Sequence, residues 1–365
     1  MSIQSTHRPG RPHPALSRRA LLAGTAAGAV GLSLAACGKG KKAGSQADSK
    51  TVTVVTHDSF HVSEDLQKAF TSETGYTLKI ATSGDAGALV NKLVLTKDAP
   101  LGDAVFGIDN TYATRALDQG VIDTSATVTL PKGAESYVVA DTPALAPIDV
   151  GDVCLNIDTG YFTGKGLTPP ATFEDLTKPE YKGLLVAINP TNSSPGMAWL
   201  LATIGHFGAG SFADYWKQLM ANGARIAEDW SAAYETDFSG SGKGTYPIVV
   251  SYASSPSFTV SKDKSSSSTS ALLDTAFRQV EYAGVLKGAA NPEGGKAFVE
   301  WMLSKAVQED IPGQMYMYPV LPDAALPEAL TKFGPLSKSP VKVDPKEITT
   351  HREEWLNTWT EAVGK

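Results

Sequence analysis

The sequence predicts an α/β fold in which the chain builds one lobe and then crosses into a second. Strands rich in β-branched residues alternate with amphipathic helices between positions 51 and 108, which is typical of a parallel sheet whose ligand-binding edge lies at the strand ends. A proline-punctuated extended segment, 143–149, then leads into the apolar run 150–157, and the alternation resumes after it. Some 315 residues follow position 50, enough for two lobes with large cores.

The elements of the first lobe follow from local patterns. The first helix is expected to begin after Ser63 and to end at Gly75, because Ser caps free amides and Gly terminates helices. A second helix begins near 84–87. The predicted strands are 51–56, 76–80 and 103–108.

The second lobe contains fewer clear elements. We expect strands at 184–188, 224–227 and 248–251, a helix at 195–206, an exposed loop at 261–270 and a C-terminal helix from 345. On that helix, Trp355 and Trp359 are four residues apart and are interpreted as core. The predicted boundaries are 51–147 with about 257–304 for lobe I, and 148–256 with about 305–365 for lobe II.

Residues 1–36 are predicted to be an export signal. Four arginines and no acid precede a run of small and apolar residues that ends in Leu34-Ala35-Ala36-Cys37. This ending is typical of a lipoprotein signal, so we expect cleavage before Cys37 and a lipid on its thiol. The arginine pair at 18–19 indicates twin-arginine export, and a Sec signal with a chance pair is the alternative. Residues 37–50 form the lipidated Cys and a flexible tether.

The charge and cysteine content exclude several classes of protein. The net charge is −6, and it becomes about −10 without residues 1–36, which hold four arginines and no acid. This acidic excess argues against nucleic acid as a partner and suits a cationic ligand. Apart from Cys37, whose thiol is predicted to carry the lipid, Cys154 is the one cysteine of the mature chain, so no intramolecular disulfide and no Cys-based zinc site is expected.

Enzyme motifs are scarce in this sequence. It contains no Gly-x-Ser-x-Gly and no His-Glu-x-x-His, and the glycine-rich stretch 240–245 lacks the spacing of a phosphate-binding loop. We therefore expect a protein that is not an enzyme and that uses no cofactor and no metal. An exported serine hydrolase is the rival from another class, but no nucleophile–base pair in the sequence supports it.

Two Ser-Ser-Pro triplets follow predicted strands, at 193–195 and 254–256. Pro suits the first helical turn and a preceding Ser caps free amides, so helix capping alone explains both triplets. The functional alternative is that hydroxyls and free amides at a helix N-terminus bind anions or polar ligand atoms.

Aromatic residues stand near the predicted strand ends. Trp230 and Tyr234 are four residues apart, Tyr252 ends a strand, and Tyr316 and Tyr318 share one face of an extended segment. Such rings either are ordinary half-buried aromatics or stack on a flat cation, which gains about 0.5–2 kcal/mol per contact. Aspartates also stand at or near predicted strand ends, where they pair with a cation or act as caps; they are Asp58, Asp85, Asp109 and Asp149.

Six motifs occur in an order that indicates a family. They are THDSF (56–60), GIDN (107–110), WSAAY (230–234), SYASSP (251–256), MYPV (317–320) and REEWLNTW (352–359). In this order the chain resembles the thiamine-binding periplasmic proteins of ABC transporters, which belong to the two-lobed type II class of solute-binding proteins. The similarity runs from about Thr51 to Val363.

The resemblance implies a type II periplasmic-binding-protein fold with a ligand cleft between two lobes that close like a hinge. It implies thiamine, thiamine monophosphate or thiamine diphosphate as the ligand. We expect a monomer, exported and held by the lipid on Cys37 at the outer face of the cytoplasmic membrane or in the periplasm, which delivers its ligand to ABC transporter permease subunits. The positions that match the family's ligand contacts are Asp85, Ser193, Ser194, Trp230, Tyr252, Ser254, Ser255 and Tyr316.

Some features depart from the family. His57 stands where relatives often have Tyr, Ala86 replaces a Gly, and four extra residues lengthen the loop before Tyr252. The alternative ligand is ferric iron, bound in the same fold by the phenolates of Tyr316 and Tyr318. Such iron sites typically use adjacent tyrosines, whereas one residue separates this pair.

Overall fold

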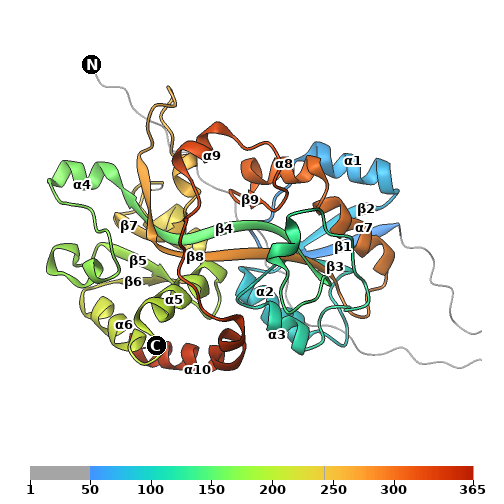
Figure 1. Ribbon diagram of the computed structural model, residues 1–365, viewed down its shortest axis with the longest axis horizontal. Coiled ribbons are helices and arrows are strands. Elements are labelled where there is room, and N and C mark those ends of the chain that lie inside the picture. Colours follow the sequence, from blue (N-terminus) through green and yellow to red (C-terminus); the bar gives the residue numbers. More distant parts are fainter. Residues whose placement is uncertain (1–49, 242, 365) are drawn as a thin grey trace, which may run out of the picture. The chain divides into compact units, whose positions relative to one another are not determined.

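A mixed β-sheet runs through the part of the chain that the structure describes (Figure 1). The structure is a computed structural model, and it describes residues 50–241 and 243–364. The predicted export signal, Cys37 and the tether up to residue 49 lie outside the described residues. In the described part, no helix combines the length and the apolar character that a membrane crossing requires.

The sheet has nine strands within the described residues, in the order β2-β1-β3-β8-β4-β7-β5-β6, and β9 pairs with β4. The strands are β1 Thr51–Thr56, β2 Thr77–Thr82, β3 Ala104–Asp109, β4 Leu145–Asp158, β5 Leu185–Ile188, β6 Arg225–Ala227, β7 Ile248–Tyr252, β8 Thr269–Val285 and β9 Tyr318–Pro319.

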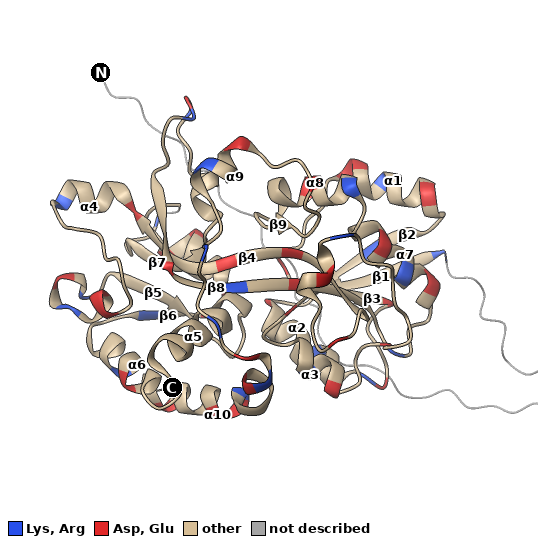
Figure 2. Ribbon diagram, viewed as in Figure 1, with Lys and Arg blue, Asp and Glu red and all other residues tan. Residues whose placement is uncertain are grey.

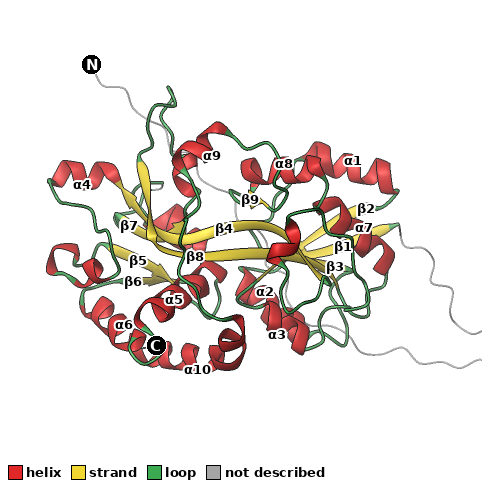
Figure 3. Cartoon of the chain, in the orientation of Figure 1, coloured by secondary structure: helices red, strands yellow, loops and turns green. Residues whose placement is uncertain are grey.

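Helices surround these strands (Figure 3). They are α1 Glu64–Thr74, α2 Ala86–Leu95, α3 Ala113–Asp118, α4 Thr159–Lys165, α5 Ser194–Phe207, α6 Phe212–Ala221, α7 Pro292–Met302, α8 Lys305–Gln314, α9 Glu328–Phe333 and α10 Pro345–Val363. A short π-helical segment, Ala232–Asp237, follows Trp230, and a 3-10 turn, Ser255–Phe258, follows β7. As expected, Trp355 and Trp359 on α10 are buried.

The direction of the strands divides the sheet into two groups joined by long strands. Strand β1 runs parallel to β2 and β3, and β5 runs parallel to β6 and β7, which confirms the predicted parallel strand–helix alternation. Strand β8 is antiparallel to β3 and β4, and β4 is antiparallel to β7, so the whole sheet is mixed. The predicted crossover is β4, and Figure 1 shows β4 and β8 extending between the two groups.

Strand β8 was not expected from the sequence. The predicted loop 261–270 ends where β8 begins at Thr269, and the strand continues for 17 residues. Its polar residues Thr275, Gln279 and Glu281 are buried along with its apolar ones, so the strand lacks the apolar–polar alternation that marks a half-buried strand. The predicted lobe boundaries, which place the middle of this strand in lobe I, stay predictions.

The ends of the helices near the sheet are determined by capping residues in the local sequence. Gly75 ends α1 with a left-handed φ of 75°, as predicted, and Ser63 precedes α1 without a side-chain capping bond. The carboxylate of Asp85 caps α2, and the hydroxyl of Ser193 accepts from the amide of Gly196 at 3.4 Å to cap α5. The amide of Ser194 also donates to Asp85, so the N-termini of α2 and α5 lie next to each other, at the cavity described below.

Candidate ligand-binding site

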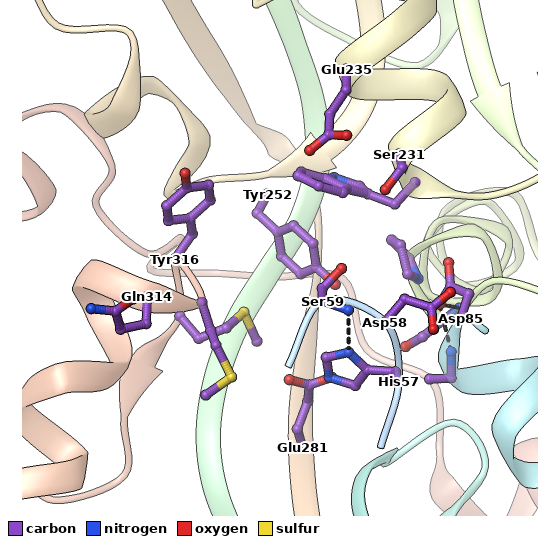
Figure 4. Close-up of a pocket in the computed structure, with 16 residues that line it drawn as sticks. His57, Asp58, Ser59, Asp85, Ser231, Glu235, Tyr252, Glu281, Gln314 and Tyr316 are labelled. Carbon is purple, nitrogen blue, oxygen red and sulfur yellow. Dashed lines mark hydrogen bonds and ion pairs between the residues drawn. The ribbon is translucent and has the colours of Figure 1, made fainter. Parts of the chain in front are cut away.

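A cavity of about 400 Å³ lies between the two groups of strands, and sixteen residues from distant parts of the sequence line it (Figure 4). Its walls come from the segment after β1, the N-termini of α2 and α5, the turn that begins at Trp230, the end of β7, the middle of the sheet and the segment after α8. Loops at strand ends supply most of these walls, as the α/β pattern predicted.

One wall of the cavity is aromatic. Trp230, Tyr252 and Tyr316 line it. The ring of Trp230 stacks on Tyr234 at 5.0 Å between centroids and 12° between planes. Tyr234 does not line the cavity, so the opposite face of the indole is the one available to a ligand. The Nε1 of Trp230 donates to the Oγ of Ser251 at 3.0 Å, which fixes the orientation of the ring.

Tyr316 is held by an unusual backbone and by a ring contact. Its φ of 65° lies in the left-handed region, which costs a non-Gly residue of the order of 1–3 kcal/mol. Its ring lies against that of Phe258, with 3.4 Å between centroids. Tyr318, the other tyrosine proposed for iron, does not line the cavity, because its hydroxyl donates to the carbonyl of Gly334 at 2.9 Å.

The lining also carries four acidic side chains. Its carboxylates are Asp58, Asp85, Glu235 and Glu281, and the lining residues include no Lys and no Arg within the described part of the chain. Acidic residues also lie along β4 and β8 in the sheet itself (Figure 2). No three of the His, Cys, Asp and Glu side chains in residues 50–241 and 243–364 are grouped to hold a metal ion. The arrangement suits a cationic organic ligand.

Asp85 joins the two sides of the cavity. Its Oδ1 accepts from the amide of Ala86 at 2.7 Å and from the amide of Ser194 at 3.2 Å. The first amide belongs to the start of α2 and the second to the start of α5. Burial raises the pKa of Asp85, and hydrogen bonds from Ser193, Ser194 and Ala86 oppose this rise. The carboxylate therefore serves as the shared cap of two helices.

Neighbouring contacts reinforce this junction. The amide of Ala88 donates to the carbonyl of Asn192 at 3.2 Å, and the hydroxyl of Tyr112 donates to the carbonyl of Pro190 at 3.0 Å. The side chain of Asp85 thus lies in a close contact between α2 and the loop before α5.

Glu281 is the centre of a polar network at the cavity floor. The Nε2 of His57 lies 3.4 Å from the Oε1 of Glu281, and the Nε2 of Gln279 donates to the same oxygen at 3.4 Å. The hydroxyl of Tyr252 donates to Gln279 at 3.2 Å, and burial raises the pKa of that hydroxyl well above its usual range. Figure 4 shows His57 beside Glu281, with its Nδ1 accepting from the amide of Ser59.

The pKa of His57 is raised by this carboxylate. Burial alone lowers the pKa of the imidazole, but the charge and hydrogen bond of Glu281 outweigh burial, and Asp85 and Asp58 act in the same direction. The lining therefore holds its negative charge close to the one histidine in the cavity.

Two more carboxylates stand beside Glu281 in the sheet. Glu281 on β8 is opposite Asp109 on β3 and opposite Asp149 on β4. Burial, followed by the charges of Glu281 and Asp85, raises the pKa of Asp109 to about 7 against hydrogen bonds from Thr111. Burial and Glu281 raise the pKa of Asp149 well above its usual range. Asp109 and Asp149 therefore release their protons less readily than an ordinary carboxyl group.

The structure brings together five of the eight predicted contact residues. Those that line the cavity are Asp85, Ser194, Trp230, Tyr252 and Tyr316. Ligand contact by all eight residues stays a prediction.

The other three predicted residues are buried beside the cavity and do not line it. Ser193 caps α5, and Ser255 shares a hydrogen bond of 2.9 Å with Ser251, the residue that receives the indole N–H of Trp230. Ser254 precedes the 3-10 turn without a side-chain capping bond.

Some cavity residues were not predicted as contacts. Glu281 was missed together with β8, and Glu235 was missed because nothing in its local sequence separates it from a surface acid. His57 and Asp58 stand directly after β1, so their position at a strand end was a usable signal. Asp149, expected at a strand end, lies within β4.

Gly107 is required by the packing of His57. It lies in a bulge of β3 with a φ of 95°, and a Cβ built there would overlap the imidazole of His57. We expect Gly107→Ala to destabilise the fold by about 2 kcal/mol or more and to move His57 away from Glu281. Urea unfolding measures the change, and Gly210→Ala, where a Cβ meets nothing within 4 Å, is the control. Equal unfolding midpoints for both variants would contradict this explanation.

Known proteins are similar to this chain in sequence and in fold. The family model for bacterial extracellular solute-binding protein matches residues 103–334. The thiamine-binding periplasmic proteins of Salmonella typhimurium and Brucella suis are each 27% identical to this chain; both alignments cover 86% of it, with 94% and 92% of the relative. These matches confirm the resemblance drawn from the motifs.

Solved structures agree with the sequence matches. A periplasmic thiamin binding protein superposes with a TM-score of 0.75 at 25% identity, covering 86% of this chain and 96% of that one. The periplasmic binding protein AfuA from Actinobacillus pleuropneumoniae gives 0.71 at 16% identity, covering 86% and 98%. The ferric binding protein from Campylobacter jejuni gives 0.65 at 17% identity, covering 85% and 99%. The last two show the fold alone, which is the predicted two-lobed periplasmic-binding-protein fold. The chain therefore belongs to the bacterial extracellular solute-binding proteins, which bind a solute for transport and are not enzymes.

Proposed function

We propose that this protein captures thiamine or one of its phosphates outside the cytoplasm and delivers it to the permease of an ABC importer. The observation that carries the proposal is a single cavity lined by three aromatic rings and four acidic side chains. Thiamine contains two flat rings, one of which is a cationic thiazolium, and such a ligand gains both from ring stacking and from nearby carboxylates. Two curated relatives named for thiamine binding support the same ligand.

Each wall has a role in the proposed complex. Trp230, Tyr252 and Tyr316 hold the aminopyrimidine and thiazolium rings by stacking. Asp85 or Glu281 faces the cation or accepts from the ring amino group. The hydroxyethyl or phosphate end points to the Ser pairs at the helix starts. Closure of the two lobes then excludes water and presents one surface to the permease.

The proposal includes the site of action. The chain is exported by its first 36 residues, carries a lipid on Cys37 and acts as a monomer at the outer face of the cytoplasmic membrane or in the periplasm. Mass spectrometry of the membrane fraction tests the anchor, because a Cys37→Ala variant would lose the lipid mass and leave the membrane.

Calorimetry with the purified full-length chain tests the ligand. We expect one thiamine per chain at micromolar concentrations or tighter, as for a pre-formed cavity that stacks on both rings. An uncharged aminopyrimidine without the thiazolium is the matched control and should bind more weakly. Absence of any thiamine binding would refute the function, and a visible charge-transfer colour on adding ferric iron would favour the iron alternative.

A further inference from the structure

The cavity offers a phosphate group very little positive charge. Four carboxylates line it, and the lining includes neither Lys nor Arg in the described part of the chain. A phosphate monoester carries about −1.5 to −2 charges at neutral pH. Like charges that are partly buried repel one another strongly, because water and salt screen them poorly. The side chains alone therefore favour a ligand without a phosphate.

Helix N-termini are the other source of positive potential at this cavity. They bind phosphate through free amides and through the helix dipole. The starts of α2 and α5 both reach the cavity, through Ala86 and through Ser194 and Pro195.

Both helix starts already hold an anion. The Oδ1 of Asp85 accepts from the amides of Ala86 and Ser194, one from each helix. The carboxylate of this protein thus occupies the position that an incoming phosphate would take. A phosphate would have to displace Asp85 or lie beside its charge.

The floor of the cavity keeps a second negative charge. Glu281 lines the cavity, is 5% exposed, and its Oε1 accepts from the Nε2 of Gln279 at 3.4 Å. His57 is its cationic or hydrogen-bonding neighbour at 3.4 Å, so the imidazole is engaged by the carboxylate and is not free for a phosphate.

We propose that this cavity selects unphosphorylated thiamine over thiamine monophosphate and thiamine diphosphate. The proposal rests on the proposed thiamine function and names the form of the ligand. The discrimination arises from Asp85, which fills the anion position at two helix starts, and from Glu281, which keeps the floor negative. The permease served by this protein would then receive the free vitamin, so any phosphate ester would first have to be hydrolysed.

Titration calorimetry of the full-length chain with thiamine, thiamine monophosphate and thiamine diphosphate tests the selection. We expect thiamine to bind at least tenfold more tightly than the monophosphate, and the diphosphate to bind more weakly still. A monophosphate that binds as tightly as thiamine, or more tightly, overturns the selection and leaves the thiamine function intact. No binding of any of the three refutes the thiamine function itself.

Two variants test the physical basis. Asp85→Asn keeps an oxygen for the amides of Ala86 and Ser194 but removes the charge, and Glu281→Gln does the same at the floor. We expect each to lower the ratio of monophosphate to thiamine dissociation constants at least threefold. Partial loss of folded protein does not change this ratio of dissociation constants, because both ligands are measured on the same folded fraction. If Asp85→Asn does not fold, Glu281→Gln tests the same idea.

Glu73→Gln is the matched control, because Glu73 is an exposed acid on α1 outside the cavity lining. Its ratio should equal that of the unchanged protein. A ratio that stays unchanged in both cavity variants overturns the assignment of selectivity to these two carboxylates.

Discussion

Replacing Trp230 with alanine is expected to weaken thiamine binding more than tenfold. The indole presents one face to the cavity while Tyr234 stacks on the other, so the ring is fixed before the ligand arrives. The variant loses the stacking area and one cation–π contact of about 0.5–2 kcal/mol, and tenfold corresponds to about 1.4 kcal/mol. Calorimetry of the two proteins side by side measures the difference.

Trp230→Phe is the matched control for this substitution. Phenylalanine keeps an aromatic face toward the cavity but loses the hydrogen bond from Nε1 to Ser251. Its affinity should fall less than that of the alanine variant. An alanine variant that binds thiamine as tightly as the unchanged protein would remove Trp230 from the site.

Much of the first group of strands could be predicted because its signals are local. The β-branched run 51–56 became β1 without any shift, and α1 lies between the predicted cap Ser63 and the predicted stop Gly75. Each of these patterns depends on neighbours a few residues apart. The secondary structure of these segments can therefore be predicted without knowing what packs against them.

Strand β8 could not be predicted because its environment is tertiary. Gln279 and Glu281 are buried by β3 and β4, which pair with β8 from residues more than 100 positions away. From sequence alone, a glutamate in such a segment is interpreted as a surface residue, because charged side chains are rarely buried. Glu281, one of the four carboxylates of the cavity lining, could therefore not be predicted as a site residue.

The Ser-Ser-Pro triplets show that the sequence alone also could not identify which residues of the site face the cavity. In the first triplet the capping interpretation is confirmed by Ser193, which caps α5, while Ser194 lines the cavity and its contact with a ligand stays a prediction. In the second triplet, Ser254 and Ser255 are both buried, and neither lines the cavity. The sequence pattern identified the region, but only the packing decides which hydroxyl faces the cavity.

The carboxyl groups of Asp109, Glu281 and Asp149 on β3, β8 and β4 are expected to lower the stability of the fold. Buried ionisable groups destabilise a fold unless they are paired or neutral. Here Asp109 and Asp149 each lie opposite Glu281, and burial raises the pKa of both aspartates, which favours their neutral forms.

Asp109→Asn is therefore expected to stabilise the protein, and increasingly so as the pH rises. The pKa of Asp109 is about 7 in the folded protein and 3.8 in an ordinary carboxyl group, so folding takes up a proton between these two values. The unfolded state binds fewer protons there, and the stability of the unchanged protein falls as the pH rises through that interval. At pH 4 or below, the ionisation of Asp109 changes the free energy of unfolding very little. Above pH 7 the penalty is complete, at most about 4 kcal/mol.

The asparagine variant escapes this penalty because it cannot ionise. Its side-chain oxygen still accepts from the amide of Thr111, as the Oδ1 of Asp109 does at 2.6 Å. Urea unfolding at pH 4, 5.5 and 7.5 should show a stability gain that is near zero at pH 4 and grows to a few kcal/mol at pH 7.5. Asp98→Asn, an exposed aspartate, should show no such trend. A gain that is the same at all three pH values, or a loss at pH 7.5, would show that Asp109 does not carry a buried proton.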